Sequence, residues 1–412
     1  MRLLLLAPFV AASCHAGEPA GPPFETFDSA GIVITESSRP LWAESEAWSL
    51  SPEPEFVIGA GDGDERYVFT DVRGVRRLPD GRIAVLDAGS NRVRLYDPSG
   101  VHLLDFGGEG DGPAEFRSSQ YLGLDGDEFV VFEAIGGNRT WWSLDGHLLR
   151  ASGPFPSEDR ASGTLIMVGT MADGTAVGVR DGPSGLPAYD VGLNRRPWSV
   201  WTFDLTAQVS DSLLEVPGAE GMILETGPGG THHQRYVFGK YSVLAVSDDR
   251  VHVGSNDEYA VRSHDRDGVL RAVVRRMMDP RPTDRADLRA WVDEWIERAH
   301  VLADERGEMR DRMLELSFAP EMPAFRSMAA DAEGNLWVED WVGVGVRQGS
   351  FSVFRPDGAW LGSVTIPEGL SEDRISYYDQ TIEIGPDYLL GVWTDEYGVD
   401  QVRLYRLEKP TG

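Results

Sequence analysis

The chain has one cysteine, Cys14, in 412 residues, and only two lysines, Lys240 and Lys409. A single cysteine excludes intramolecular disulfides and any zinc or redox site built from cysteines. No apolar run reaches the roughly 18 residues that a membrane-spanning helix needs. Phosphate-binding loops, HExxH pairs, GxSxG elbows and EF-hand spacings are also missing. Local motifs therefore identify no reaction, and the sequence leaves open whether the protein is an enzyme.

Positive charge is scarce as well. The 38 Lys and Arg residues stand against 67 Asp and Glu residues, which gives a formal net charge of −29. A field of that sign opposes docking on nucleic acid or on anionic lipid, because both need clustered cations. We expect no nucleic-acid partner and interpret most of the acidic residues as solvated surface. The hydrophobic fraction of 41% is that of an ordinary folded protein rather than a disordered one.

The N-terminus has the pattern of an export signal. Arg2 precedes an apolar run, Leu3 to Ala12, of suitable length for a signal peptide. The segment Val10-Ala11-Ala12-Ser13-Cys14 resembles a bacterial lipobox, with Ala11 where leucine is preferred. The resemblance implies a signal peptide over residues 1–13, lipidation of Cys14, and a lipoprotein of the cell envelope that contacts the membrane only through its anchor. His15 after the cysteine favours the outer membrane. Ordinary cleavage near Cys14 is the alternative.

The rest of the chain repeats one unit, in which an apolar strand is followed by a tight acidic turn and further strands. The equivalent turn residues are separated by 46, 47, 75, 85 and 53 residues: Gly81, Asp127, Gly174, Asp249, Gly334 and Asp387. A base period of about 46 residues with two insertions is typical of four-stranded propeller blades. We therefore predict an all-β fold, a six-bladed β-propeller over residues 45–409, preceded by a tether and N-terminal segment over 14–44.

The first repeat adds a family resemblance. Its segments are Leu78-Pro-Asp-Gly-Arg-Ile-Ala-Val-Leu-Asp87, Asn91-Arg-Val-Arg-Leu-Tyr-Asp97, Gly100, and Phe106-Gly-Gly-Glu-Gly-Asp-Gly-Pro-Ala-Glu-Phe116. This run resembles the consensus of NHL-type six-bladed β-propellers, with Ala114 where glycine is usual. The later repeats keep the strand pattern but lose most of the signature. The resemblance implies the fold, but this class contains scaffolds, ligand binders, lactonases and lyases, so it does not choose a function.

Closure of the ring can also be predicted. The sixth repeat supplies three strands and ends in Gln401-Val-Arg-Leu-Tyr-Arg406. A fourth strand must cover the edge, because an open edge promotes aggregation. The segment from Ala47-Trp-Ser-Leu50 to Phe56-Val-Ile58 precedes the first full repeat and is the natural donor. We expect it to close the last blade.

The long insertions share one face of the predicted ring. They occupy residues 181–197, 218–235, 278–325 and 341–349, all in the two loop types that emerge on the same side of a four-stranded meander. Binding residues concentrate on variable loops held by a rigid scaffold, so we expect this face to bind.

The third of these insertions is predicted to be helical over about residues 280–320, between blades 4 and 5. Thr283 would cap the helix, and Gly307 would separate it from a second short one. A stripe follows at helical spacing: Leu288, Trp291, Val292, Trp295, Ala299 and Leu302. The stripe is interpreted as packing on its own domain. A lid over the channel or a docking surface is the alternative.

Superposing the repeats brings two sets of residues to the insertion-bearing face. The ends of the second strands carry Asp87, Glu133, Arg180, Ser255, Asp340 and Trp393. The starts of the innermost strands carry Arg73, Arg117, Thr164, Lys240, Arg326 and Asp379. Four cations would converge at the channel mouth and favour a small anionic ligand such as a carboxylate or sugar acid. Alternatively, these cations pair with the carboxylates of the first set and hold the blades together.

Evidence for a cofactor is weak. Asp62-Gly-Asp64 and Glu109-Gly-Asp111 could suggest Ca²⁺, but such glycine-rich segments are also the usual turns between blades. We predict no resident cofactor and identify no catalytic or metal-ligating residue.

Three function classes remain. The first is a monomeric surface lipoprotein that binds a small anionic ligand or a protein partner through the loop-rich face. The second is a lactonase-like or lyase-type enzyme that uses a divalent metal at the channel mouth. The third is a structural or assembly module.

Overall fold

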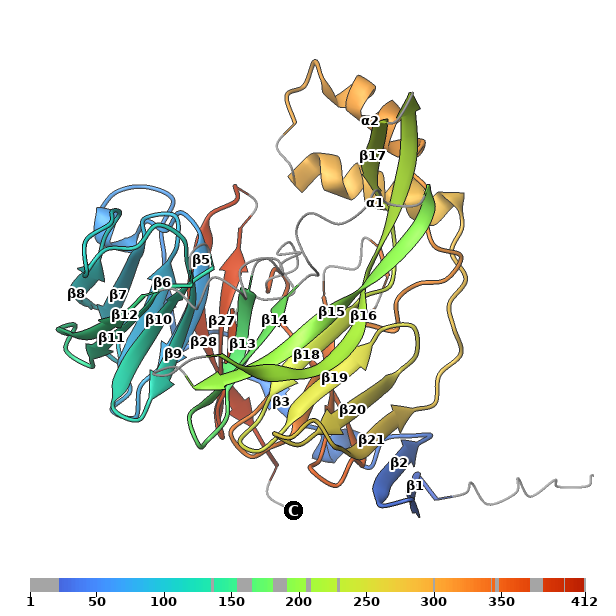
Figure 1. Cartoon of the computed structure of the whole chain (residues 1–412), viewed down its shortest axis with the longest axis horizontal. Helices are drawn as coiled ribbons and strands as arrows, with labels where there is room; N and C mark the ends of the chain where they lie inside the picture. The colour runs from blue at the N-terminus through green and yellow to red at the C-terminus, as the bar shows by residue number, and fades with distance from the viewer. Residues whose placement is uncertain are drawn as a thin grey trace, which may run out of the picture.

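The computed structural model of the chain describes residues 22–134, 137–153, 165–180, 191–204, 209–227, 230–298, 301–341, 343–344, 348–370, 381–395 and 397–410. The predicted signal peptide and Cys14 lie outside these ranges, as do Thr164 and Asp379. The described strands form six sheets, and consecutive strands within each repeat pair antiparallel (Figure 1).

The first and second sheets each contain four strands in chain order. The first sheet consists of β5 (Val72–Arg77), β6 (Ile83–Asp87), β7 (Arg92–Tyr96) and β8 (His102–Gly107). The second consists of β9 (Ser119–Asp125), β10 (Glu128–Glu133), β11 (Arg139–Ser143) and β12 (Leu148–Ser152).

The third and fourth sheets are enlarged. The third consists of β13 (Leu165–Thr170), β14 (Thr175–Arg180), β15 (Gly192–Asp204), β16 (Val209–Gly227) and β17 (Gly230–Arg235). The fourth consists of β18 (Ser242–Val246), β19 (Val251–Ser255), β20 (Ala260–His264) and β21 (Leu270–Arg276), extended by the hairpin of β1 (Phe24–Ser29) and β2 (Ile32–Ser37). Strand β2 pairs in parallel with β21, so part of the N-terminal segment predicted over residues 14–44 belongs to the fourth sheet.

The fifth sheet again has four strands, and the sixth is closed from the N-terminus. The fifth consists of β22 (Phe325–Ala330), β23 (Leu336–Asp340), β24 (Ser350–Phe354) and β25 (Trp360–Thr365). The sixth consists of β26 (Ile382–Ile384), β27 (Tyr388–Thr394) and β28 (Asp400–Glu408), with β3 (Ser49–Leu50) and β4 (Phe56–Ile58) both pairing with β28. The expected donor segment therefore covers the last edge.

The first strands of the six sheets follow one another around an axis. Strand β5 contacts β9, and the series continues through β13, β18, β22 and β26 back to β5. Each second strand begins one or two residues after one of the six turn residues of the predicted repeat. The Asp/Gly turns fit their sites, since Gly81, Gly174 and Gly334 adopt positive φ angles of 80–88° that disfavour other residues. The chain is an all-β propeller.

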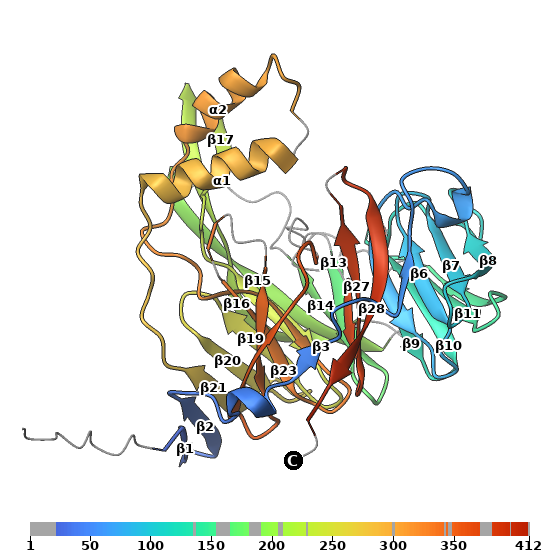
Figure 2. The ribbon, with the colours of Figure 1, turned by 180° about the vertical axis from the view of Figure 1, so that it is seen from behind.

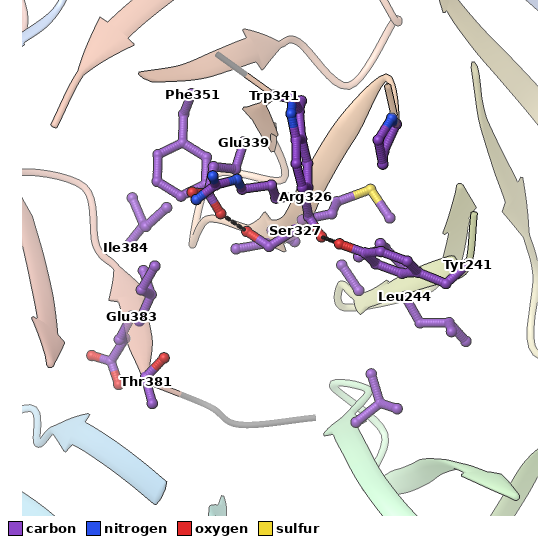
Figure 3. Close-up of a pocket in the computed structure, with 18 of the residues that line it drawn as sticks. Tyr241, Leu244, Arg326, Ser327, Glu339, Trp341, Phe351, Thr381, Glu383 and Ile384 are labelled. Carbon is purple, nitrogen blue, oxygen red and sulfur yellow. Dashed lines mark hydrogen bonds between the residues drawn. The ribbon is translucent and has the colours of Figure 1, made fainter. Parts of the chain in front are cut away.

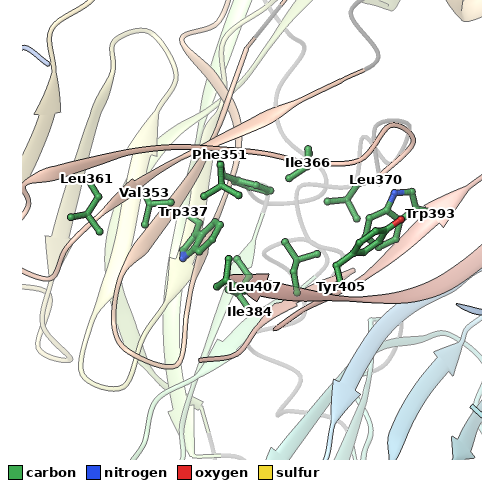
Figure 4. Packing of buried hydrophobic residues seen from close by; sticks show 12 residues of the cluster. Trp337, Phe351, Val353, Leu361, Ile366, Leu370, Ile384, Trp393, Tyr405 and Leu407 are labelled. Atoms are coloured by element: carbon green, nitrogen blue, oxygen red, sulfur yellow. The ribbon is translucent and has the colours of Figure 1, made fainter. Parts of the chain in front are cut away.

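The core lies between neighbouring sheets rather than within one. Strand β6 is buried at all five positions, because both of its faces are covered. The cluster in Figure 4 joins the fifth and sixth sheets, with Trp337 and Phe351 on one side and Leu389 and Trp393 on the other. These apolar layers hold the inner strands in fixed positions around the axis.

The helices lie between β21 and β22. Helix α1 (Arg285–Arg298) and helix α2 (Arg306–Leu314) gather with β17 and the tips of β15 and β16 at one end of the molecule (Figures 1 and 2). Asp284, rather than Thr283, caps α1, because its carboxylate accepts the N–H groups of Ala286 and Asp287 at 2.6 and 3.1 Å. Of the insertion expected as a loop over residues 218–235, residues 218–227 continue β16 and residues 230–235 form β17. Two short 3₁₀ turns, Glu44–Glu46 and Glu65–Tyr67, complete the elements.

The helical stripe is divided between two environments. Leu288, Val292 and Ile296 are buried against Val237 and Phe238, which follow β17. Leu302, expected to extend the stripe, lies beyond the helix and is 64% exposed. None of the described helices is both long and apolar enough to cross a membrane.

Candidate functional site

A cavity of about 1910 Å³ lies along the inner strands β18, β22 and β26 and extends to α1. At the helical end its wall includes Trp291 and Trp295 of α1 and Tyr236 after β17. The Arg235 guanidinium lies 4.9 Å from the centre of the Trp291 ring, a cation–π distance. The helical insertion therefore both packs on the fold and forms part of the cavity mouth.

Arg326, at the start of β22, is the predicted cation that faces this cavity most openly. Its guanidinium lies 4.6 Å from the centre of the Trp341 ring. Its Nε is buried and has no hydrogen-bond partner, and no ion pair of its guanidinium occurs within the described residues. Arg76, Arg235, Lys240 and Arg403 also line the cavity, but each has other contacts. Among the described cavity cations, Arg326 is the one whose guanidinium has no hydrogen bond or ion pair to a described residue.

Glu339, on β23, lies beside Arg326 in the same wall (Figure 3). The Ser327 hydroxyl donates a hydrogen bond of 2.6 Å to its carboxylate. Burial raises the pKa of Glu339, while the Arg326 charge and the Ser327 hydrogen bond oppose that rise. The wall therefore holds a cation with unused donors next to a carboxyl group that binds its proton more tightly than an exposed glutamate does.

A second carboxyl group, the half-buried Glu383 of β26, lines the cavity on another side (Figure 3). Its carboxylate accepts the backbone N–H of Arg77 at 3.2 Å and the Tyr388 hydroxyl. Burial raises the pKa of Glu383, and the Arg76 charge opposes the rise. Unlike Glu339, this carboxylate joins the first and sixth sheets, because its partners come from both.

Lys240 and Trp393 are the other predicted residues that reach the cavity. The Lys240 ammonium donates to the backbone carbonyls of Glu321 (3.1 Å) and Met322, so it fastens the end of the helical insertion. Burial lowers the pKa of Lys240. Trp393 is 1% exposed and packs 5.0 Å from the Tyr405 ring. These two residues support the cavity wall.

Asp87 does not belong to the cavity. It is fully buried and accepts the backbone N–H groups of Thr70 and Asp71 at 3.1 and 3.0 Å, the Ser90 hydroxyl at 2.7 Å and the Arg94 guanidinium at 3.0 Å. Each of the two carboxylate oxygens accepts two of these hydrogen bonds. Asp87 therefore has a structural role, because it connects the segment before β5 to Arg94 of β7.

Glu133 and Asp340 have the same structural role, because hydrogen bonds within the fold also hold their carboxylates. Glu133 accepts the backbone N–H groups of Arg117 (2.6 Å) and Ser118 (3.2 Å) and the Asn138 amide. Asp340 accepts the Arg276 guanidinium and the Tyr259 hydroxyl, each at 2.7 Å, and the Ser352 hydroxyl at 2.9 Å. Neither carboxylate lines the cavity, so the structure does not bring these two predicted ligand-binding residues to the candidate site.

Of the four cations expected to converge at the channel mouth, Lys240 and Arg326 line the cavity, whereas Arg73 and Arg117 do not. Arg73 pairs with Asp71 at 2.8 Å, and Arg117 pairs with Asp111 in the adjoining loop. Arg180 is 3% exposed and lies against the Trp201 ring at 4.9 Å. None of these three arginines lines the cavity. Their partners are nearby carboxylates or a ring, and not Asp87, Glu133 or Asp340 as the alternative interpretation of the sequence expected.

The segments considered for calcium are likewise occupied by arginine. Asp64 caps the turn Glu65–Tyr67 and binds Arg66, which lowers the pKa of Asp64 to about 2. Asp111 is bound by Arg117. Within the described ranges, no three His, Cys, Asp or Glu residues are grouped so as to hold a metal ion.

Sequence reasoning missed Glu339, Glu383 and Ser327. The available signal was an acidic residue next to apolar residues of a predicted strand, as in Leu336-Trp-Val-Glu339 and Ile382-Glu-Ile384. Acidic residues are rarely buried unless they have an ion-pair or hydrogen-bond partner or belong to a functional site. Superposing the sequence repeats identified Asp340, which is the residue after Glu339, instead of Glu339 itself.

Comparison with known proteins gives structural similarity only. No family model matches the chain, and no curated protein matches it. A member of the DUF4221 family from Bacteroides vulgatus superposes with a TM-score of 0.49 at 9% identity, over 89% of this chain and 100% of that one. A gluconolactonase from Xanthomonas campestris gives 0.39 at 15% identity, over 83% and 87%. Virginiamycin B lyase from Staphylococcus aureus gives 0.38 at 12%, over 88% and 99%. All three TM-scores are below 0.5, so these similarities carry no argument about function.

Proposed function

We propose that this protein is a lipid-anchored six-bladed propeller of the bacterial cell envelope that binds a small carboxylate ligand in its central cavity. The observation that carries the binding proposal is Arg326. It supplies guanidinium donors without hydrogen-bond acceptors in the described structure, in the wall of a cavity large enough for a small molecule. A carboxylate matches the planar fork of a guanidinium, and the flanking Trp341 ring favours a ligand that also has an apolar or ring face.

The remaining cavity charges restrict the ligand. Ten acidic and five basic side chains are among the described cavity residues. The acidic residues on α1, Asp293, Glu294 and Glu297, lie at the mouth. A highly charged anion would be repelled by this lining, whereas one carboxylate on a mostly neutral body can use Arg326 alone. We therefore propose a monocarboxylate, such as a sugar acid.

The test is a binding measurement on the mature protein. Gluconate, glucuronate and benzoate are titrated by calorimetry and by the shift in melting temperature, with sorbitol as the uncharged counterpart of gluconate. We expect at least one carboxylate to bind and sorbitol not to bind. Arg326→Ala should weaken binding roughly tenfold or more, because a charge-assisted hydrogen bond is lost. Arg73→Ala removes a predicted cation outside the cavity and should leave the affinity unchanged.

Two results would contradict this function. One is the absence of binding for all three carboxylates. The other is an equal loss in both arginine variants, which would place the anion outside the cavity.

The anchor is tested separately. Cys14→Ser should abolish labelling by a fatty-acid probe and move the protein from the membrane fraction to the soluble extract of the envelope. Retention in the membrane fraction without labelling would contradict lipid anchoring at Cys14.

A further inference from the structure

The wall beside Arg326 contains a group that the proposed binding does not yet use. Glu339 is 9% exposed, and its one hydrogen bond among the described residues comes from Ser327. A buried carboxylate normally has several donors, as Asp87 and Asp340 do. Glu339 therefore has acceptor capacity left over, immediately beside a guanidinium that has donors left over (Figure 3).

The charges that act on Glu339 come from two strands. Arg326 of β22 attracts the ionised form, and Asp340, the next residue on β23, repels it. Asp340 is itself held by Arg276 of β21. Strand β24, which pairs with β23, contributes no charged residue over Ser350–Phe354. On β26, Glu383 lines the same cavity but has its own partners, Arg77 and Tyr388. The protonation state of Glu339 is thus decided by burial, the Arg326 charge, the Ser327 hydrogen bond and, to a smaller extent, the Asp340 charge.

We propose that Glu339 is a built-in counter-charge to Arg326 and that a carboxylate ligand binds when Glu339 carries a proton. This inference rests on the proposed function, since it concerns the same cavity. In the ionised state Glu339 partly neutralises the field of Arg326 and repels a second carboxylate. In the protonated state it repels nothing, and its O–H donates a hydrogen bond to the ligand carboxylate while Arg326 donates from the other side.

The arrangement makes binding depend on pH in a defined direction. Burial raises the pKa of Glu339, so the protonated form persists above the pH at which an exposed glutamate ionises. Affinity should be highest under acidic conditions and fall as Glu339 ionises. If binding requires the proton, the affinity decreases by up to about tenfold for each pH unit above that pKa. A carboxylate ligand remains ionised over most of this range. The change of affinity with pH therefore reports the ionisation of Glu339 and not that of the ligand.

The experiment compares Glu339→Gln with the unaltered protein, using gluconate, glucuronate and benzoate from pH 5 to pH 8. Glutamine keeps the shape and a donor but cannot ionise, so it mimics the protonated acid. We expect the variant to bind at pH 8 roughly tenfold or more tightly than the unaltered protein and to show a flat pH profile. Glu36→Gln is the matched control, because it removes a carboxylate that faces Arg275 at 2.7 Å outside the cavity. It should keep the original profile.

The outcomes separate this inference from the function on which it rests. If a carboxylate binds but Glu339→Gln retains the pH slope, the counter-charge role is wrong and the binding function stands. If Glu339→Gln weakens binding at every pH, Glu339 acts only as a structural part of the wall. If no carboxylate binds to either protein at any pH, the proposed function fails and this inference fails with it.

Discussion

The first and fifth sheets use buried acidic residues in opposite ways. In the first sheet, Asp87 ends the second strand and has four hydrogen-bond donors around it. In the fifth sheet, the equivalent Asp340 is likewise satisfied, but Glu339 precedes it, faces the cavity and has one donor among the described residues. The difference shows that a repeated position maintains the fold, whereas its neighbour on the other side of the strand is available for binding.

The largest effect that tests this comparison is expected at Asp87. Asp87→Ala leaves the Arg94 guanidinium, whose side chain is 7% exposed, without its carboxylate. Removing one member of a buried ion pair costs about 3–5 kcal/mol, so the free energy of unfolding should fall by that amount. Chemical denaturation of Asp87→Ala and Arg326→Ala measures the contrast. The second variant breaks no hydrogen bond or ion pair with a described residue and should be affected much less. Equal losses would show that Arg326 is also structural.

The predictability of the fold follows from the same repetition. Each second strand is an apolar segment after an Asp/Gly-type turn, and both features are local, so the sequence alone located all six strands. The closing segment, residues 47–58, was predictable because an uncovered last edge is unfavourable. The β1–β2 hairpin was not predictable in this way, since its parallel pairing with β21 depends on contacts almost 240 residues away along the chain.

The site was harder to predict for a geometric reason. Successive side chains of a strand point to opposite faces, so an error of one position exchanges the cavity for the core. The pairing of β22 with β23 contains an irregularity between Phe325 and Met328. That irregularity lies where Arg326 and Ser327 approach Glu339. The residue pattern of the sequence does not predict the irregularity. Equivalent positions in other repeats therefore indicated Asp340 instead of Glu339.

A smaller effect is expected from the pH dependence of stability. The pKa of Glu339 is raised in the folded state, so its contribution to stability is complete below the pKa of the unfolded chain and is lost as the pH rises through the folded value. Glu339→Gln lacks this loss. The melting temperature of the variant relative to the unaltered protein should therefore increase between pH 5 and pH 8, by roughly 1–3 °C.

The control for that measurement is Glu36→Gln, whose difference from the unaltered protein should stay constant from pH 5 to pH 8. Asp87→Ala represents the loss of a purely structural carboxylate, because this substitution should destabilise the sheet at every pH in this range. If the melting-temperature difference between Glu339→Gln and the unaltered protein does not change with pH, Glu339 is as firmly held as Asp87. The proposed distinction between a structural carboxylate and a cavity carboxylate would then be wrong.

The smallest effect is expected at Ser327, whose hydroxyl supplies the 2.6 Å hydrogen bond to Glu339. That bond stabilises the ionised carboxylate and lowers the pKa of Glu339 against the effect of burial. Ser327→Ala should therefore raise this pKa further and cost about 1 kcal/mol at pH 8, where the carboxylate is ionised. At pH 5 the cost should be smaller, since less of the group is charged. Chemical denaturation at the two pH values measures the difference, and an equal cost at both would show that Ser327 acts only through packing.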